Sequence, residues 1–214
     1  MKKKLLAIVL MMTLAAAFCL SGCGGGDSAA SAEGADTSAA EEAESPVMDG
    51  AAYGYGGDDP IEIAAYKYMC EEVTKNFDAA DVSIPVVTIF AEDLTNPDDV
   101  LVYGSFEVYN YTIDGDTLKC VSGGEFPGVM HMSGDQENGY TVTAFEEVAS
   151  GGDFDDSAKA LFGDYYENFM TVYSDDAARA ENRKITVSDY VNLNGLDINY
   201  FQDEGWDPVE LYKK

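Results

Sequence analysis

One segment near the N-terminus has too few hydrophobic side chains to fold, and it confines the globular part of the chain to the residues on its C-terminal side. Residues 24–47 are mostly Gly, Ala, Ser, Asp and Glu, and no Lys or Arg occurs between Lys4 and Lys67. Such a composition cannot bury enough apolar surface to offset its conformational entropy. We therefore expect a flexible acidic linker over residues 23–57 and a single globular domain over residues 58–214.

The N-terminus has the parts of an export signal in the expected order. Lys2–Lys4 is positively charged, and the 16 residues of Leu5–Leu20 are apolar except for Thr13. That run is shorter than a comfortable membrane span and is typical of a signal peptide. It leads into Leu20-Ser21-Gly22-Cys23, which resembles the lipobox of bacterial lipoproteins.

The resemblance covers residues 1–23 and implies how the chain is anchored. Residues 1–22 would be a signal peptide removed before Cys23, whose sulfur would carry diacylglycerol. Acyl chains buried in the bilayer would hold the mature protein on the extracytoplasmic face of the cell membrane. An ordinary secretory signal and a retained helical anchor are the alternatives. The Gly- and Ser-rich spacer resembles those of Gram-positive lipoproteins.

Charge disfavours one class of partner. The chain has 12 Lys and Arg against 40 Asp and Glu, a net charge of −28. Nucleic-acid binding depends on Lys and Arg at phosphates, so we expect no nucleic-acid partner. With 46% hydrophobic and 12% aromatic residues, the chain still has the apolar surface that a core requires.

Local patterns predict an α+β domain. Two aspartates followed by Pro60 predict a helix over residues 60–78, with one apolar stripe. Runs of β-branched and aromatic residues predict a meander of about five antiparallel strands. These strands are expected at residues 85–90, 100–111, 117–122, 126–132 and 140–148. Asp114-Gly115 and Asn138-Gly139 are typical of hairpin turns.

Helices are expected after the strands. A second helix begins near Asp155, and its apolar stripe continues to Tyr173. Further on, Asn194-Gly195 either ends a short helix from Ser188 or turns a hairpin, and we favour the helix. The order of elements over residues 60–150 loosely resembles cystatin-like and nuclear-transport-factor-like folds. Such folds serve many unrelated functions, so the resemblance implies no particular activity.

Two cysteines belong to the predicted domain. Cys70 lies on the apolar stripe of the first helix, and Cys120 shares a strand face with Leu118. Disulfides persist in exported proteins, so we expect a Cys70–Cys120 disulfide, with two buried free thiols as the alternative. A catalytic thiol is not expected, because His131 is the only histidine that could act as its base.

The remaining candidates for chemistry are few. On a strand, His131 would point away from Met130 and Met132, which favours a structural histidine over a copper ligand. The sequence contains no G-x-S-x-G and no H-E-x-x-H motif, and we expect no catalytic residues.

Three clustered carboxylates are the one candidate for a metal site. Asp153, Asp155 and Asp156 come after two glycines and offer the oxygen ligands that calcium prefers. The alternative is the start of a helix, where acids interact favourably with the helix dipole. No other cofactor is expected.

Tyrosine is abundant, with 14 residues. Nine aromatic residues could line a sugar- or peptide-binding cleft or could pack in the core: Tyr66, Tyr68, Tyr103, Tyr109, Tyr111, Tyr165, Tyr166, Tyr173 and Trp206. Alternation along a strand predicts that Tyr103, Tyr109 and Tyr111 share one face.

These observations favour a lipid-anchored lipoprotein whose domain binds a ligand or partner at the cell envelope without catalysis. The expected ligand is an envelope protein, a peptide or a glycan. An extracellular enzyme that acts on cell wall or glycan through carboxylates is one alternative. A calcium-dependent structural or adhesive module is the other.

Overall fold

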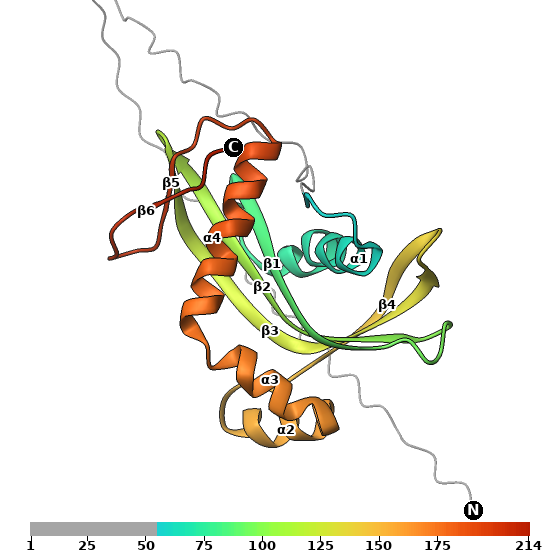
Figure 1. The fold of residues 1–214 in the computed structure, drawn as a ribbon. Coiled ribbons are helices and arrows are strands. Elements are labelled where there is room, and N and C mark those ends of the chain that lie inside the picture. Colours follow the sequence, from blue (N-terminus) through green and yellow to red (C-terminus); the bar gives the residue numbers. More distant parts are fainter. Residues whose placement is uncertain (1–54) are drawn as a thin grey trace, which may run out of the picture. The chain divides into compact units, whose positions relative to one another are not determined.

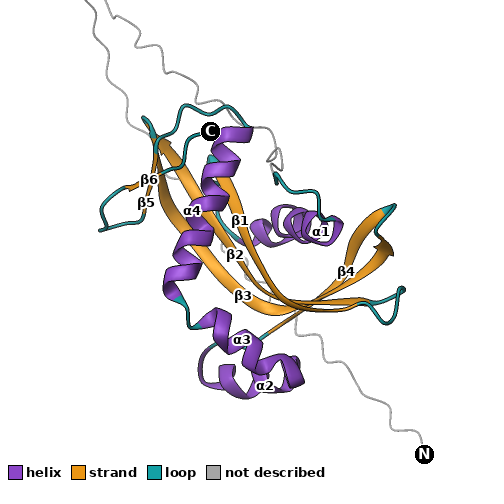
Figure 2. Ribbon diagram, viewed as in Figure 1, coloured by secondary structure: helices purple, strands orange, loops and turns teal. Residues whose placement is uncertain are grey.

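The computed structural model describes residues 55–214, so the predictions for Cys23, the signal peptide and most of the linker lie outside it. The described residues form an α+β domain with helices on both faces of a mixed, mostly antiparallel sheet (Figures 1 and 2). The α+β prediction is thus confirmed. No helix in residues 55–214 is long and apolar enough to cross a membrane.

Helix α1 (Pro60–Tyr68) begins where its cap predicts. The Asp59 carboxylate accepts a hydrogen bond from the backbone N–H of Ile61 at 2.8 Å, and the proline takes the first helical position. The chain then continues through a π-helical turn over Met69–Val73 and a 3₁₀ turn that ends at Asn76. The predicted helical segment is confirmed, although only its first half is α-helical.

Four long strands form an antiparallel meander, and two short strands extend the sheet. They are β1 (Val82–Asp93), β2 (Val100–Asp114), β3 (Thr117–Asp135), β4 (Gly139–Glu147), β5 (Tyr200–Gln202) and β6 (Val209–Glu210). The order is β1-β2-β3-β5-β6, with β4 also paired to β3. The β3–β5 pair is parallel, and the other pairs are antiparallel.

The prediction of separate strands at residues 117–122 and 126–132 is wrong, because both belong to β3. The two glycines between them stay in the ladder: Gly123 is opposite Tyr109, and Gly124 is opposite Val108. Both predicted turns are confirmed, between β2 and β3 and between β3 and β4.

Three helices come after the meander, and their boundaries differ from the prediction. They are α2 (Phe154–Phe162), α3 (Tyr166–Tyr173) and α4 (Asp176–Leu193). The predicted second helix is divided at Gly163, whose positive φ of 52° is incompatible with a continuing α-helix. Ser188 lies inside α4 instead of starting a helix, and its hydroxyl donates to the Lys184 carbonyl. Asn194 ends α4, so the hairpin alternative is wrong.

Side-chain alternation along β2 divides the core between two faces of the sheet. Val102, Phe106 and Val108 pack in the cluster that contains the buried side of α1. Tyr103 points to the other face, where its ring centroid lies 4.7 Å from that of Tyr165, which directly precedes α3.

The predicted common face of Tyr103, Tyr109 and Tyr111 is confirmed. Tyr109 and Tyr111 both contact Arg183 of α4, on the same side of the sheet as the helices that Tyr103 meets. The bulge nearby adds its extra residue, Val121, to β3. The alternation along β2 is therefore undisturbed.

Candidate functional site

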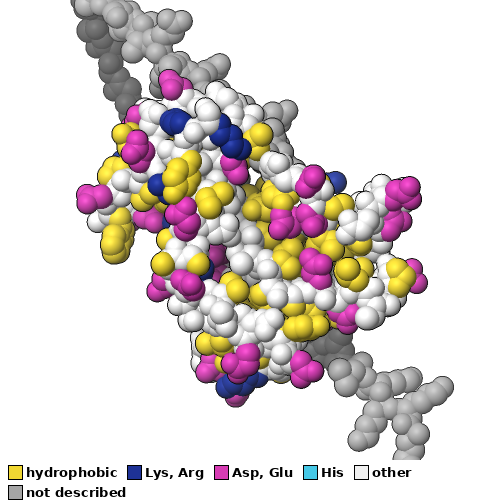
Figure 3. Space-filling view, in the orientation of Figure 1, with side chains coloured by type: hydrophobic (Ala, Val, Ile, Leu, Met, Phe, Trp, Pro, Cys, Tyr) yellow, Lys and Arg dark blue, Asp and Glu magenta, His cyan; other side chains and the backbone are white. Residues whose placement is uncertain are grey.

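A cavity of about 320 Å³ lies where α1 and α4 meet beside strand β1, and we call it the α1–α4 cavity. Strand β1 is at one end of the strand order, so helices from the two faces of the sheet can approach each other around it. Figure 3 shows hydrophobic side chains gathered between α4 and α1 on this face of the molecule, with acidic side chains around them.

Helical periodicity explains which side chains reach the cavity. Glu62, Tyr66 and Cys70 are spaced four residues apart, so they project from one side of α1 and the turn after it. From α4, the cavity is lined by Asn182, Ile185, Thr186, Asp189 and Tyr190. Their spacing of three and four residues again marks one face of a helix.

Aromatic rings supply much of the apolar lining. The rings of Tyr55 and Tyr66 are stacked, with centroids 4.5 Å apart and planes at 22°. Burial raises the pKa of Tyr66, whose hydroxyl hydrogen-bonds the Thr186 side chain and the Val87 backbone. These contacts join α1 to both α4 and β1, so the wall of the cavity is also part of the core.

The charged groups at the cavity are carboxylates. Glu62 and Asp189 line it, and no Lys or Arg is among its described lining residues. Burial raises the pKa of Glu62. On strand β1, burial and the negative charges of Asp59 and Glu62 raise the pKa of Glu92. The surroundings of the cavity are therefore negative.

The cavity thiol is not activated. Burial, assisted by Glu71, raises the pKa of Cys70 to about 12. A thiol with such a pKa stays protonated at neutral pH, and it is the thiolate that acts as a nucleophile. Cys70 therefore behaves as a small apolar group in the wall.

The structure differs from the expected Cys70–Cys120 disulfide, because both residues are free cysteines. Cys70 faces the α1–α4 cavity, whereas Cys120 lies beside Asp203 and Arg183. As the alternation of side chains along the strand predicts, Cys120 packs with Leu118 in one hydrophobic cluster. That cluster is formed with α4 and the C-terminal segment, and it does not contain Cys70. The alternative of two free thiols is the one that the structure has.

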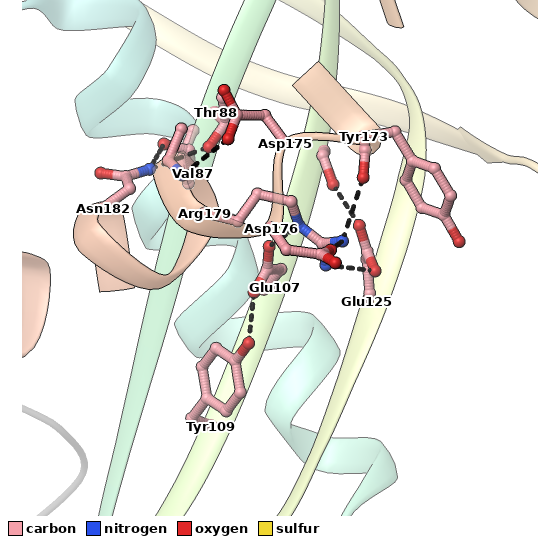
Figure 4. A network of polar contacts seen from close by, with 12 residues as sticks. Val87, Thr88, Glu107, Tyr109, Glu125, Tyr173, Asp175, Asp176, Arg179 and Asn182 are labelled. Atoms are coloured by element: carbon pink, nitrogen blue, oxygen red, sulfur yellow. Dashed lines mark hydrogen bonds and ion pairs between the residues drawn. The ribbon is translucent and has the colours of Figure 1, made fainter. Parts of the chain in front are cut away.

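Apart from the cavity, a cluster of charged side chains around Arg179 connects α4 to the middle of the sheet (Figure 4). Glu107 on β2 and Glu125 on β3 are directly opposite each other, and Arg179 of α4 reaches both. Its Nη2 lies 2.6 Å from Glu125 Oε2, and its Nε lies 3.4 Å from Glu107 Oε1. Ser105 and Tyr109 donate hydrogen bonds to the same carboxylates.

One helical turn later, Arg183 holds the C-terminal segment. Its Nη1 and Nη2 donate to the two carboxylate oxygens of Asp203 at 2.8 and 2.6 Å, and its Nε donates to the Tyr111 hydroxyl at 3.1 Å. The guanidinium carbon lies 3.6 Å from the centroid of the Tyr109 ring. The hydrogen bonds from Arg183 hold the pKa of Asp203 below its usual range.

This cluster has the properties of a structural network. Glu107, Glu125 and Asp203 each pair with an arginine, although burial raises the pKa of Glu125. In residues 55–214, no buried side-chain N or O atom lacks a hydrogen-bond partner. A carboxylate held by a guanidinium is poorly suited to transfer a proton, so the geometry favours positioning of α4 over catalysis.

No family model, curated protein or solved structure matches this chain.

The candidate calcium ligands do not form a metal site. Asp153 directly precedes α2, and Asp155 and Asp156 lie exposed in its first turn. There, their negative charges interact favourably with the positive end of the helix dipole. Among the described residues, no group of three or more His, Cys, Asp or Glu side chains could hold a metal ion. The helix-start interpretation of these aspartates agrees with the structure.

His131 occupies a position that suits a structural role. Its Nδ1 lies 2.9 Å from Asp99 Oδ1, and its Nε2 lies 3.4 Å from Glu146 Oε1. Met130 and Met132 are fully buried in the cluster on the α1 face and do not share these contacts.

The nine aromatic residues considered for a binding cleft do not gather around one cavity. Of the nine, only Tyr66 lines the α1–α4 cavity, and Trp206 is 76% exposed away from it. Glu62, Asp189 and Tyr190 also line the cavity, and no sequence pattern indicated them as site residues. The four-residue spacing of Glu62 and Tyr66 can be read from the sequence, but the full length of α4 and the meeting of its face with that of α1 cannot.

Proposed function

We propose that this protein is a lipid-anchored extracytoplasmic lipoprotein whose domain binds a small organic group in the α1–α4 cavity without catalysis. The observation that carries the proposal is the cavity itself, whose volume of about 320 Å³ and aromatic lining suit a small ligand. The end of a peptide or glycan chain at the cell envelope has this size. The lipobox-like sequence ending at Cys23 supports the anchor.

The chemistry of the described residues supports binding rather than catalysis. The cavity thiol is held protonated by burial, and the paired carboxylates of the α4 network are engaged by arginines. The imidazole of His131 is engaged by Asp99 in a different part of the domain.

Filling the mouth of the cavity is expected to abolish most ligand binding. Ile185 lines the cavity and is 44% exposed, so Ile185→Trp adds volume without disturbing the core. We expect binding to weaken by about tenfold or more, which corresponds to about 1.4 kcal/mol. The measurement is thermal melting of the purified protein against amines, peptides and glycans, and then calorimetric titration of each compound that raises Tm.

Val121→Trp is the matched control, because Val121 is 55% exposed on β3 and does not line the cavity. It should leave both Tm and affinity unchanged. If no compound raises Tm, or if Ile185→Trp binds as tightly as the unmodified protein, the proposal is wrong.

The anchor has its own test. The intact mass of the exported protein should correspond to cleavage before Cys23 with an acyl modification on that residue. Cys23→Ala should leave an uncleaved precursor or release the protein into the medium, because no acyl chain then holds it at the bilayer. A mature protein with an unmodified Cys23 thiol would contradict lipid anchoring.

A further inference from the structure

We infer that the α1–α4 cavity selects a ligand that carries a positively charged amine. The inference rests on the proposed function, since it names the charge of the group that the same cavity would bind. It depends on three features of the cavity: its partly compensated negative charge, the placement of its two carboxylates on different helices, and its aromatic lining.

The negative charge of the cavity is only partly compensated. Asp189 pairs with Lys214 at 2.7 Å, but this pair is exposed, with 40% and 65% of the two side chains accessible. Within residues 55–214, no salt bridge joins Glu62 to a Lys or Arg. A half-buried carboxylate without a cationic partner is stabilised when a ligand brings one.

The two carboxylates are placed to act together. Glu62 projects from α1 and Asp189 from α4, so they come from the two helices that border the cavity. Asp59 and Glu92 add negative potential near Glu62, because the charges of Asp59 and Glu62 both raise the pKa of the Glu92 carboxyl. An anionic ligand would be repelled by Glu62, whereas an ammonium would be attracted by Glu62 and also by Asp189, whose exposed pair with Lys214 compensates its charge only in part.

Aromatic rings complete the match to an ammonium ion. Tyr55, Tyr66 and Tyr190 line the cavity, and the face of an aromatic ring attracts a cation electrostatically. Methylated ammonium groups suit such surroundings, because their methyl groups contact the rings while the charge interacts with the acids. The chemical class that fits is therefore a primary or quaternary alkylammonium with a small apolar body.

The test compares probes that differ in charge and hardly in shape. Choline is titrated against its neutral carbon analogue 3,3-dimethylbutan-1-ol, and hexylamine is titrated against hexan-1-ol. At least one cation is expected to bind about tenfold or more tightly than its neutral counterpart, as cation–π and ion-pair contacts in a partly desolvated site allow.

Charge-neutralising variants locate the effect. Glu62→Gln and Asp189→Asn should each weaken binding of the cation several-fold, by about the size expected for a single ion pair, and leave binding of the neutral probe unchanged. Glu72→Gln is the control. Glu72 lies just after α1 on the same helical segment, pairs with Lys75 at 2.9 Å and does not line the cavity.

The outcomes separate this inference from the proposed function. Equal binding of cation and neutral analogue, or no effect of Glu62→Gln and Asp189→Asn on the cation, would overturn the inference and leave a binding cavity. Absence of binding by every probe would also overturn it, and the broader panel with Ile185→Trp would then decide the proposed function separately.

Discussion

Arg183→Met is expected to lower the free energy of unfolding by about 3 kcal/mol, at the lower end of the cost of removing one partner from a buried ion pair. The Arg183 side chain is only 11% accessible and donates to both carboxylate oxygens of Asp203 and to the Tyr111 hydroxyl. Methionine keeps much of the volume but leaves these acceptors without their donor. The lower end of that range is expected because the Asp203 side chain is 41% accessible, so water can solvate its carboxylate once the arginine is removed.

The measurement is urea denaturation, in which the midpoint should fall while the slope m stays constant. Arg183→Lys should recover only part of the loss, because an ammonium cannot reproduce the two parallel hydrogen bonds of a guanidinium. Lys159→Met is the matched control at an exposed position of α2, and it is expected to change the free energy of unfolding by no more than about 0.5 kcal/mol. An Arg183→Met midpoint equal to that of the control would show that the network contributes nothing to stability.

Phe169→Ala is expected to cost about 3–5 kcal/mol, the usual range for removing a buried aromatic side chain. Phe169 of α3 is fully buried at the centre of the cluster formed by α2, α3 and the sheet. Its ring centroid lies 4.7 Å from that of Phe162 and 5.0 Å from that of Tyr173. Alanine would leave a space that rings on several sides cannot close without moving backbone.

Trp206→Ala tests whether the loss of stability expected for Phe169→Ala comes from the burial of the side chain or merely from its aromatic character. Trp206 is 76% exposed, and its loss should change the free energy of unfolding by no more than about 0.5 kcal/mol. Both variants are compared by urea denaturation at one pH. Similar midpoints for the two variants would mean that α2 and α3 are not packed on the sheet as described.

The parts of the fold that sequence analysis predicted correctly depend on neighbouring residues. The Asp59 cap and its proline begin α1 because an aspartate side chain can satisfy N–H groups only two and three residues away. Gly115 lies in the turn between β2 and β3 and Gly139 begins β4 after the next turn, because each has a positive φ that a residue with a side chain rarely adopts. The common face of Tyr103, Tyr109 and Tyr111 results from the geometry of one strand.

The errors concern elements whose limits depend on distant partners. The glycines at 123 and 124 predict an interruption, yet β3 continues because β2 supplies hydrogen bonds along its length. The predicted helix start at Ser188 is wrong because α4 already begins at Asp176, where Arg179 and Arg183 pair with carboxylates on the sheet and the C-terminal segment. The disulfide expectation failed because Cys70 and Cys120 share no core cluster.

By itself, the sequence determined the acidic character, the α+β class and most of the turns and caps, because each depends on composition or on residues within about one turn of one another. Only the tertiary structure decided that Glu62 and Tyr66 lie across one cavity from Asp189 and Tyr190. These two pairs are more than a hundred residues apart in the chain. Their juxtaposition depends on how two helices pack around the edge of a curved sheet, and no local pattern encodes that geometry.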